Sequence, residues 1–336
     1  MEKTGKGVKF LRSKTFTLVV ILVLIILFFY LFSPNNSYLG IRNITSILNS
    51  TVIYILFTIA VSFPILSGEF DLSPGYVGTC AGATMATLIT KVGVPWPITM
   101  IICLAMGIAF GLLNAVLINE FKIQSFIATL TVGSFVARGF SYIIPGGKPI
   151  RVEQRAIVWL GDFRIGGVVP IAIIISLVIL VIYGIILAKT KFGRSVYLCG
   201  GSKKAAQLAG LNPKKISYII FANSGMLGAF AGMLYAARTQ IGDLVVATNT
   251  YAFPAVTAAI FGGITFGGGS GNMLGCFLGL LIINGFNNGL TIMGVTSYWQ
   301  DVASGILLLI ALTLDYLSKQ RSLRLVTLEM AKRNEG

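Results

Sequence analysis

The sequence predicts an all-α, polytopic membrane protein. Three observations support this class: the composition, the spacing of the apolar runs and the clustering of charge. Hydrophobic residues make up 55% of the 336-residue chain and charged residues 11%, which is about half the charged fraction of an ordinary soluble domain. Most polar residues separate apolar runs of about 20 residues, the length that crosses a bilayer. A soluble protein would have to bury several such runs in one mid-sized core.

Ten apolar runs are interpreted as membrane spans. The first, at 16–32, follows a basic leader and has no small-x-small cleavage site after it, so we interpret it as an uncleaved anchor rather than a signal peptide. Ten spans return the C-terminus to the side of the N-terminus. The predicted spans are 16–32, 47–66, 74–90, 97–118, 124–145, 169–188, 216–238, 252–265, 271–291 and 298–318.

The net charge of +15 is concentrated in three segments beside the spans. Five Lys and Arg lie in 1–14, seven in 189–215 and five in 319–336. Such clustering is typical of cytoplasmic segments of membrane proteins and places all three, with both termini, in the cytoplasm. Contact with anionic membrane lipid is a secondary interpretation, and no nucleic-acid partner is predicted. The domain organisation is then a cytoplasmic basic leader at 1–14, one transmembrane domain at 15–318 and a cytoplasmic basic tail at 319–336.

The segment 146–168 is the one sizeable loop predicted on the outer side. It mixes acidic and basic residues. A water-exposed loop and a docking surface for an extracytoplasmic partner are both compatible with this composition.

Two glycine-containing stretches interrupt the apolar runs. "GEFDLSPG" at 68–75 and "FGGITFGGGSGN" at 261–272 are poor helix interiors. Irregular backbone at membrane depth is tolerated only inside protein or along a water-filled cavity. Both stretches therefore predict discontinuous or re-entrant elements, and their occurrence in both halves suggests an internal repeat. GxxxG spacings at 228–232, 271–279 and 285–289 predict close helix packing.

The chain lacks the residues of most catalytic and metal sites. It has no histidine, the commonest general base and metal ligand, and its four cysteines show no CxxC spacing. Neither a phosphate-binding loop nor a nucleophile–base–acid set is present. We therefore predict no catalytic residue, no metal site and no cofactor bound by this chain.

A few ionisable or polar residues fall inside the spans or the first break: Asp71, Ser73 and Arg138. A charge at mid-bilayer costs about 2.5–3.5 kcal/mol on insertion scales, so each needs an explanation. We name Asp71, Ser73 and Arg138 as candidate residues of a solute pathway. For Asp71 and Arg138 a structural role in neutralising another charge is an equal alternative. Asp301 was expected nearer the interface.

One face of the predicted span 271–291 is polar. Asn284, Asn287, Asn288 and Thr291 follow helical spacing. Amides and hydroxyls bind neutral polyols without a net-charge cost, and they also form interhelical hydrogen bonds. We interpret the face as part of a solute pathway.

The stretch "GSKKAAQLAGLNPKKI" at 201–216 has the pattern of a short capped helix. Ser202 suits the N-cap, 203–209 the helix, and Gly210 the C-terminal stop. A short polar helix between two spans is suited to a groove on another protein. A solvated linker is the alternative, but a linker would not need a capped helix with apolar side chains.

The chain resembles the permease subunits of ribose-type ABC importers for simple sugars. The resemblance lies in "TKFGRSVYLCGGSKKAAQLAGL", "GEFDLSPG", "FIATLTVGSFVARG" and the last two spans, and it covers most of 45–315. It implies a ten-span permease of the bacterial cytoplasmic membrane that works by alternating access. The implied partners are a second permease subunit, an extracytoplasmic sugar-binding protein, and separate ATP-binding cassette subunits that bind ATP and Mg. By this resemblance the coupling helix comprises Ser202, Lys203, Lys204, Ala205, Ala206, Gln207, Leu208, Ala209 and Gly210.

The solute and the energy source stay open at this stage. Pentoses, hexoses and an autoinducer-2-like furanose all fit the family. At Glu69 and Pro74 the chain differs from the residues common in that family. The main alternative function is a secondary, ion-coupled transporter of a small polar solute, with Glu69 and Asp71 as proton carriers. A membrane-embedded enzyme and a scaffold have less support.

Overall fold

The structure of the chain is a computed structural model that describes residues 14–244, 246–300, 302–310, 312–313 and 316, with the side chains of 14, 246–250 and 252 excepted. Three predicted features lie outside the described residues: residues 1–13 of the basic leader, the basic tail and Asp301.

Helices make up nearly all of the described structure, and they follow the predicted order. The first half contains α2 (Lys14–Phe32), η1 (Pro34–Leu39), α3 (Ile41–Leu66), α4 (Pro74–Thr87), η2 (Leu88–Val92), α5 (Trp96–Asn119), α6 (Ser125–Thr131), η3 (Val132–Ala137) and α7 (Arg138–Ile143). The second half contains α8 (Arg155–Asp162), α9 (Ile171–Lys189), α10 (Lys191–Gly201), α11 (Lys203–Leu208), α12 (Pro213–Thr239), α13 (Val246–Phe261) and α14 (Met273–Ile292), followed by helical residues 297–300 and 302–310.

Seven helical segments are long and apolar enough to cross a membrane. They are Thr15–Phe32, Ile41–Leu66, Trp96–Asn119, Ser125–Ile143, Ile171–Lys189, Pro213–Thr239 and Met273–Ile292. The other three predicted spans correspond to the short helix α4 with its π-helical extension η2, to α13, and to the helical residues after 296. The chain is therefore a polytopic all-α membrane protein, whereas the number ten is not confirmed.

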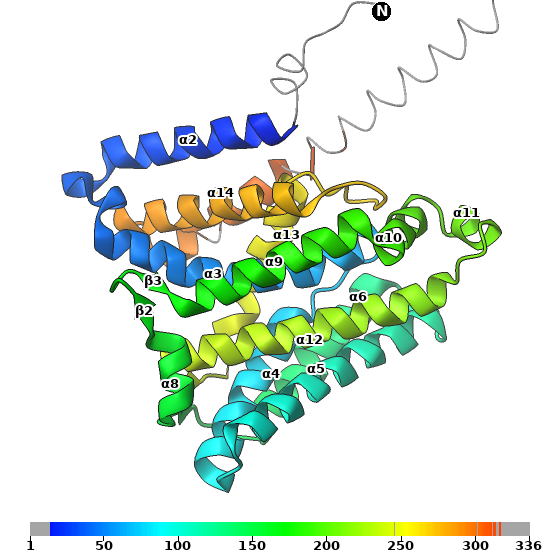
Figure 1. Cartoon of the computed structure of the whole chain (residues 1–336), viewed down its shortest axis with the longest axis horizontal. Helices are drawn as coiled ribbons and strands as arrows, with labels where there is room; N and C mark the ends of the chain where they lie inside the picture. The colour runs from blue at the N-terminus through cyan, green and yellow to red at the C-terminus, as the bar shows by residue number, and fades with distance from the viewer. Residues whose placement is uncertain (1–13, 245, 301, 311, 314–315, 317–336) are drawn as a thin grey trace, which may run out of the picture.

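The long helices run side by side, with α3 and α12 at the centre. Figure 1 shows α2 along one edge, α4 and α5 along the other, and α10 and α11 together at one end of the bundle. We call that end the α11 end. The opposite end carries two small antiparallel pairs: β1 (Ile150–Arg151) with β4 (Ile241–Gly242), and β2 (Arg164–Ile165) with β3 (Val169–Pro170).

The predicted outer loop is more than a solvated connection. Within 146–168, Ile150, Val152 and Ile157 are buried and pack with α4, α5 and α12. This packing fixes the loop on the end of the bundle opposite α11.

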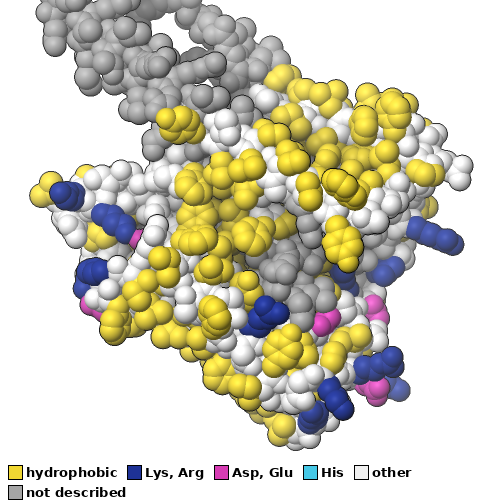
Figure 2. Space-filling model, turned by 180° about the vertical axis from the view of Figure 1, so that it is seen from behind, with side chains coloured by type: hydrophobic (Ala, Val, Ile, Leu, Met, Phe, Trp, Pro, Cys, Tyr) yellow, Lys and Arg dark blue, Asp and Glu magenta, His cyan; other side chains and the backbone are white. Residues whose placement is uncertain are grey.

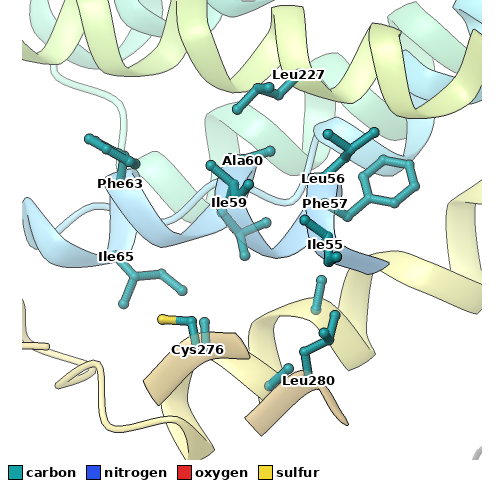
Figure 3. Close-up of a cluster of buried hydrophobic side chains, with 14 of the residues drawn as sticks. Ile55, Leu56, Phe57, Ile59, Ala60, Phe63, Ile65, Leu227, Cys276 and Leu280 are labelled. Atoms are coloured by element: carbon teal, nitrogen blue, oxygen red, sulfur yellow. The ribbon is translucent and has the colours of Figure 1, made fainter. Parts of the chain in front are cut away.

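The main hydrophobic cluster is built around α3, which is buried on all sides from Thr51 to Leu66. Ile59 and Phe63 of α3 lie between Leu227 of α12 and Cys276 of α14 (Figure 3). A helix that is apolar on every face is typical of the interior of a membrane bundle.

Glycines bring the central helices to backbone contact, as their GxxxG spacing predicted. A Cβ at Gly232 of α12 would lie 1.9 Å from the carbonyl oxygen of Gly78 in α4. A Cβ at Gly275 of α14 would lie 2.0 Å from the carbonyl oxygen of Gly262, just after α13. Packing of this kind replaces the hydrophobic driving force that helices lack in lipid.

Both predicted breaks are non-helical, and they meet in space. Residues 67–73 separate α3 from α4, and 262–272 separate α13 from α14. The ring centroids of Phe70 in the first break and Phe266 in the second are 4.7 Å apart. The two breaks lie together at the α11 end, where Gly269 N donates to the carbonyl oxygen of Leu66 at 2.9 Å.

Candidate coupling and pathway sites

The predicted short helix is present as α11. The Ser202 hydroxyl accepts a hydrogen bond from Ala205 N at 3.2 Å, so Ser202 is the N-cap that the sequence predicted. Gly210 has φ +78°, a left-handed conformation that ends helices and suits glycine. Leu211 N then donates to the carbonyl oxygen of Ala206 at 3.0 Å.

Most of the predicted coupling segment protrudes from the bundle. Among residues 202–210 only Ala206 is buried, and the side chain of Leu208 is 91% exposed. A capped helix that exposes its largest apolar side chain at the end of a membrane protein has the properties of a protein-binding element.

The sequence did not predict α10, which comes directly before α11. Thr190 caps it by accepting a hydrogen bond from Gly193 N at 3.1 Å. The signal available in the sequence was Thr190, a residue type that suits a helix N-cap. Burial raises the pKa of the Cys199 thiol in this helix, which agrees with a packing role for that cysteine.

Three glycine segments converge beneath α11. A Cβ at Gly200 would lie 1.9 Å from the carbonyl oxygen of Leu66 and 2.5 Å from Gly269 N. Gly268, at φ +81°, would place a Cβ 2.6 Å from Gly68 N. The glycine junction, defined as Gly68, Gly200 and Gly268, therefore joins both breaks to the end of α10 by direct backbone contact.

A cavity of about 700 Å³ opens beside this junction. Its walls come from both breaks, the start of α6, α13 and the helical residues near 308–312. Glu69, Lys203 and Lys122 are its charged lining residues, and apolar side chains such as Phe253 and Phe266 supply most of the rest.

Glu69 and Lys203 form an ion pair at the cavity wall. The Glu69 carboxylate accepts from Lys203 Nζ; the Glu69 side chain is 9% exposed and the Lys203 side chain 57%. The other ion pair found in the described part of the chain joins Lys214 Nζ to Glu120 Oε2 at 3.0 Å. In that exposed pair the hydrogen bond from Lys214 holds the pKa of Glu120 below its usual value.

Asp71 and Ser73 are buried away from the cavity. Asp71 Oδ1 accepts from Ser73 N at 2.9 Å and from Ser73 Oγ at 2.6 Å. Asn114 of α5 donates in turn to Ser73 Oγ at 2.9 Å. All three residues are 1% exposed or less, and none lines the cavity. These contacts anchor the start of α4 and favour the structural interpretation of Asp71 over the pathway interpretation.

Arg138 is exposed. It is the fourteenth residue of the 19-residue span Ser125–Ile143. No acidic group lies within ion-pair distance of it among the residues that the structure describes. A lipid-facing guanidinium at that depth would be costly, so this face of the span calls for a protein partner or for water.

The polar face of α14 meets other helices rather than the cavity. Asn284 donates to Thr51 Oγ1 at 2.8 Å and accepts from Ser50 Oγ at 2.9 Å, both from α3. Asn288 donates to Asn43 Oδ1 at 2.9 Å. On the other side, Ser304 Oγ donates to Asn287 Oδ1 at 3.2 Å, and Thr291 Oγ1 contacts Gln300 Oε1 at 3.4 Å. The contacts of Asn284 and Asn288 favour interhelical hydrogen bonding.

The predicted pathway residues are thus not brought together. Asp71 and Ser73 lie in the α4–α5 core, Asn284 and Asn288 against α3, and Arg138 on an exposed face. Glu69, a possible proton carrier in the alternative function, is paired with Lys203. Local sequence patterns could not predict this pair, because 134 residues separate the two.

A family model described as "Branched-chain amino acid transport system / permease component" matches residues 43–312. The chain belongs to this permease family. The resemblance to ABC importer permeases, inferred from the motifs, is thereby confirmed.

Curated relatives of this permease cover nearly the whole chain. The probable ABC transporter permease protein YphD of Escherichia coli is 32% identical over 322 residues, which cover 95% of this chain and 96% of YphD. The ribose import permease protein RbsC of Escherichia coli is 31% identical, with 89% of this chain and 92% of RbsC covered. The xylose transport system permease protein XylH of Escherichia coli is 27% identical, with 94% and 95% covered. No solved structure matches the chain.

Asn284→Ala tests whether the polar face of this permease is structural. The variant loses the hydrogen bonds to α3, each contributing about 0.6–1.7 kcal/mol in a bilayer. We expect a lower unfolding temperature in nanodiscs with an unchanged KM for uptake. Thr291→Ala, an exposed position, is the control and should change the unfolding temperature less. Unchanged stability together with a raised KM for Asn284→Ala would instead support a pathway role.

Proposed function

We propose that this permease is the membrane-spanning subunit of an ATP-driven importer of a simple sugar in the bacterial cytoplasmic membrane. Family membership supports a transport subunit. The printed names of two relatives that cover about nine-tenths of the chain state ribose import and xylose transport. The proposed solute class is therefore a ribose-type pentose, a hexose or an autoinducer-2-like furanose.

The observation that carries the proposal is the geometry of α11. The helix is capped, buried at one residue only, and presents Leu208 to solvent at 91% exposure. A solvated linker would gain nothing from this exposed leucine, whereas a groove on an ATP-binding cassette subunit would bury it. The same end of the bundle holds the cavity, so a push on α11 acts close to the solute path.

The charge distribution supports a cytoplasmic α11 end. Figure 2 shows apolar side chains across the middle of the molecule, with most charged side chains toward its ends. The α10–α11 region belongs to the basic segment 189–215, and basic segments beside spans favour the cytoplasm. The opposite end, with 146–168 and η1, then faces the extracytoplasmic binding protein.

The mechanism we propose is alternating access through a pair of permease subunits. Two such subunits would enclose a central path, with the exposed Arg138 face turned toward the partner subunit or the path rather than toward lipid. The ATP-binding cassette subunits bind ATP and Mg and hydrolyse the nucleotide; closure of these subunits moves α11 and opens the path toward the loaded binding protein.

The secondary-transporter alternative has less support because both of its candidate acids are engaged. Glu69 pairs with Lys203, and Asp71 is hydrogen-bonded to Ser73 in a buried position. Of the two acids only Glu69 lines the cavity, and there it is paired with Lys203.

The energy source is tested by uptake of radiolabelled ribose and xylose into proteoliposomes. The vesicles hold the permease with its ATP-binding cassette subunits, with binding protein supplied outside. We expect uptake that requires luminal ATP and persists with ionophores. Uptake by the permease alone that follows an ion gradient would contradict the proposal.

Leu208→Arg tests the docking role of α11. The substitution puts a charge where an apolar contact is expected, so we predict loss of co-purification with the ATP-binding cassette subunits and at least about a tenfold fall in uptake. The spans should keep their unfolding temperature, because Leu208 contacts little of the bundle. Ile165→Arg, at 47% exposure on the opposite end, is the matched control and should retain co-purification. Normal assembly of Leu208→Arg would remove α11 from the docking surface.

A further inference from the structure

The glycine junction joins three segments that lie far apart in the sequence. Gly200 is the last but one residue of α10 and lies two residues before the Ser202 cap of α11. Gly68 lies in the first break and Gly268 in the second. The backbones touch: Gly269 N donates to the carbonyl oxygen of Leu66 at 2.9 Å, and a Cβ at Gly200 would lie 1.9 Å from that oxygen. At contacts this close, one segment cannot shift without displacing the segments packed against it.

The contact continues on both sides of the junction. Tyr197 of α10 donates to the carbonyl oxygen of Gly271 at 2.6 Å, which ties α10 to the end of the second break. In the first break, Phe70 N donates to Ser125 Oγ at 3.0 Å and Leu72 N to Thr129 Oγ1 at 3.3 Å, which ties this break to α6. All of these segments supply walls of the 700 Å³ cavity or lie next to them.

The Glu69–Lys203 ion pair links the start of α11 to the first break across the glycine junction. Lys203 is the first residue of α11, and Glu69 follows Gly68 in the first break. The Glu69 side chain is 9% exposed, and its carboxylate accepts a hydrogen bond from Lys203. Loss of one partner from such a pair is far more costly than loss of an exposed pair.

We propose that Glu69 and Lys203 are positioning residues for energy coupling. Their ion pair, supported by the glycine junction, makes α11 and the two cavity-lining breaks move as one body, so that displacement of α11 reshapes the cavity. This inference rests on the proposed function and adds the route by which the work of the ATPase reaches the solute path.

The decisive experiment measures solute transported per ATP hydrolysed by the reconstituted complex. For Glu69→Lys we expect that ratio to fall about tenfold, with ATP hydrolysis within about twofold of wild type. For Lys203→Glu, which also alters the docking helix, we expect the same fall in the ratio at whatever rate of hydrolysis the variant retains. The double exchange restores an attractive pair and should recover the ratio to within about threefold of wild type. The matched control is Glu120→Lys, which removes the exposed pair with Lys214 and should leave the ratio unchanged.

A purely structural role would affect assembly and not the ratio. Each variant is therefore checked for co-purified ATPase and for its unfolding temperature. Where Glu69→Lys fails to assemble, the isosteric Glu69→Gln replaces it, and the expected result is again hydrolysis without matching transport. A normal ratio in an assembled Glu69 variant, or no recovery in an assembled double exchange, overturns the inference.

The glycine junction provides an independent arm of the test. Gly200→Ala inserts a methyl group into the contact with Leu66, whereas Gly201→Ala places one where no atom lies within 4 Å. We expect a reduced transport ratio for the first variant and a wild-type ratio for the second. Equal ratios in two assembled variants contradict the inference.

The outcomes separate this inference from the proposed function. A wild-type complex without ATP-dependent uptake refutes the proposed function. If the wild-type complex is active but its transport ratio is unchanged by substitutions in the ion pair and at Gly200, only the coupling route is refuted.

Discussion

Three backbones can meet at the α11 end only because no side chain stands between them. A Cβ at Gly200 or Gly268 would collide with a neighbouring main chain, and Gly68 adopts a φ of +77° that suits glycine. In a membrane bundle the helices gain little from hydrophobic exclusion, so contact at this range is what holds such segments in register. The cavity walls, the start of α11 and the two breaks take their relative positions from this junction.

The junction also explains why the two breaks belong to one functional unit. Non-helical backbone at membrane depth needs protein or water around it, and here each break supplies the other's surroundings. The rings of Phe70 and Phe266 are in tilted contact, and Gly269 N donates a hydrogen bond to the carbonyl oxygen of Leu66. The first break is held from its other side by Asp71, Ser73 and Asn114. The breaks thus face the cavity with one side and the rigid core with the other.

Local patterns in the sequence predicted what depends on local physics. The cap at Ser202, the stop at Gly210, the two glycine breaks and the GxxxG contacts follow from backbone chemistry within a few residues. The hydrogen-bond and ion-pair partners of side chains could not be predicted from such local patterns. From the sequence, the amide of Asn284 could equally face a solute or another helix. Only the packing of α14 on α3 shows that this amide donates to Thr51 and accepts from Ser50. The Glu69–Lys203 pair depends on the tertiary fold in the same way.

The central claim, that α11 and the second break form one moving body, is tested most directly by distances between spin labels. Labels at Lys204 and Ser270 report on that body, and a label at Ile165 marks the opposite end; all three positions are exposed, and the four native cysteines are buried. The complex is compared with and without trapped ATP, with labels on one permease subunit. The account predicts that the Lys204–Ser270 distance stays constant while both distances to Ile165 change. A change in the Lys204–Ser270 distance with Ser270 fixed relative to Ile165 would contradict it.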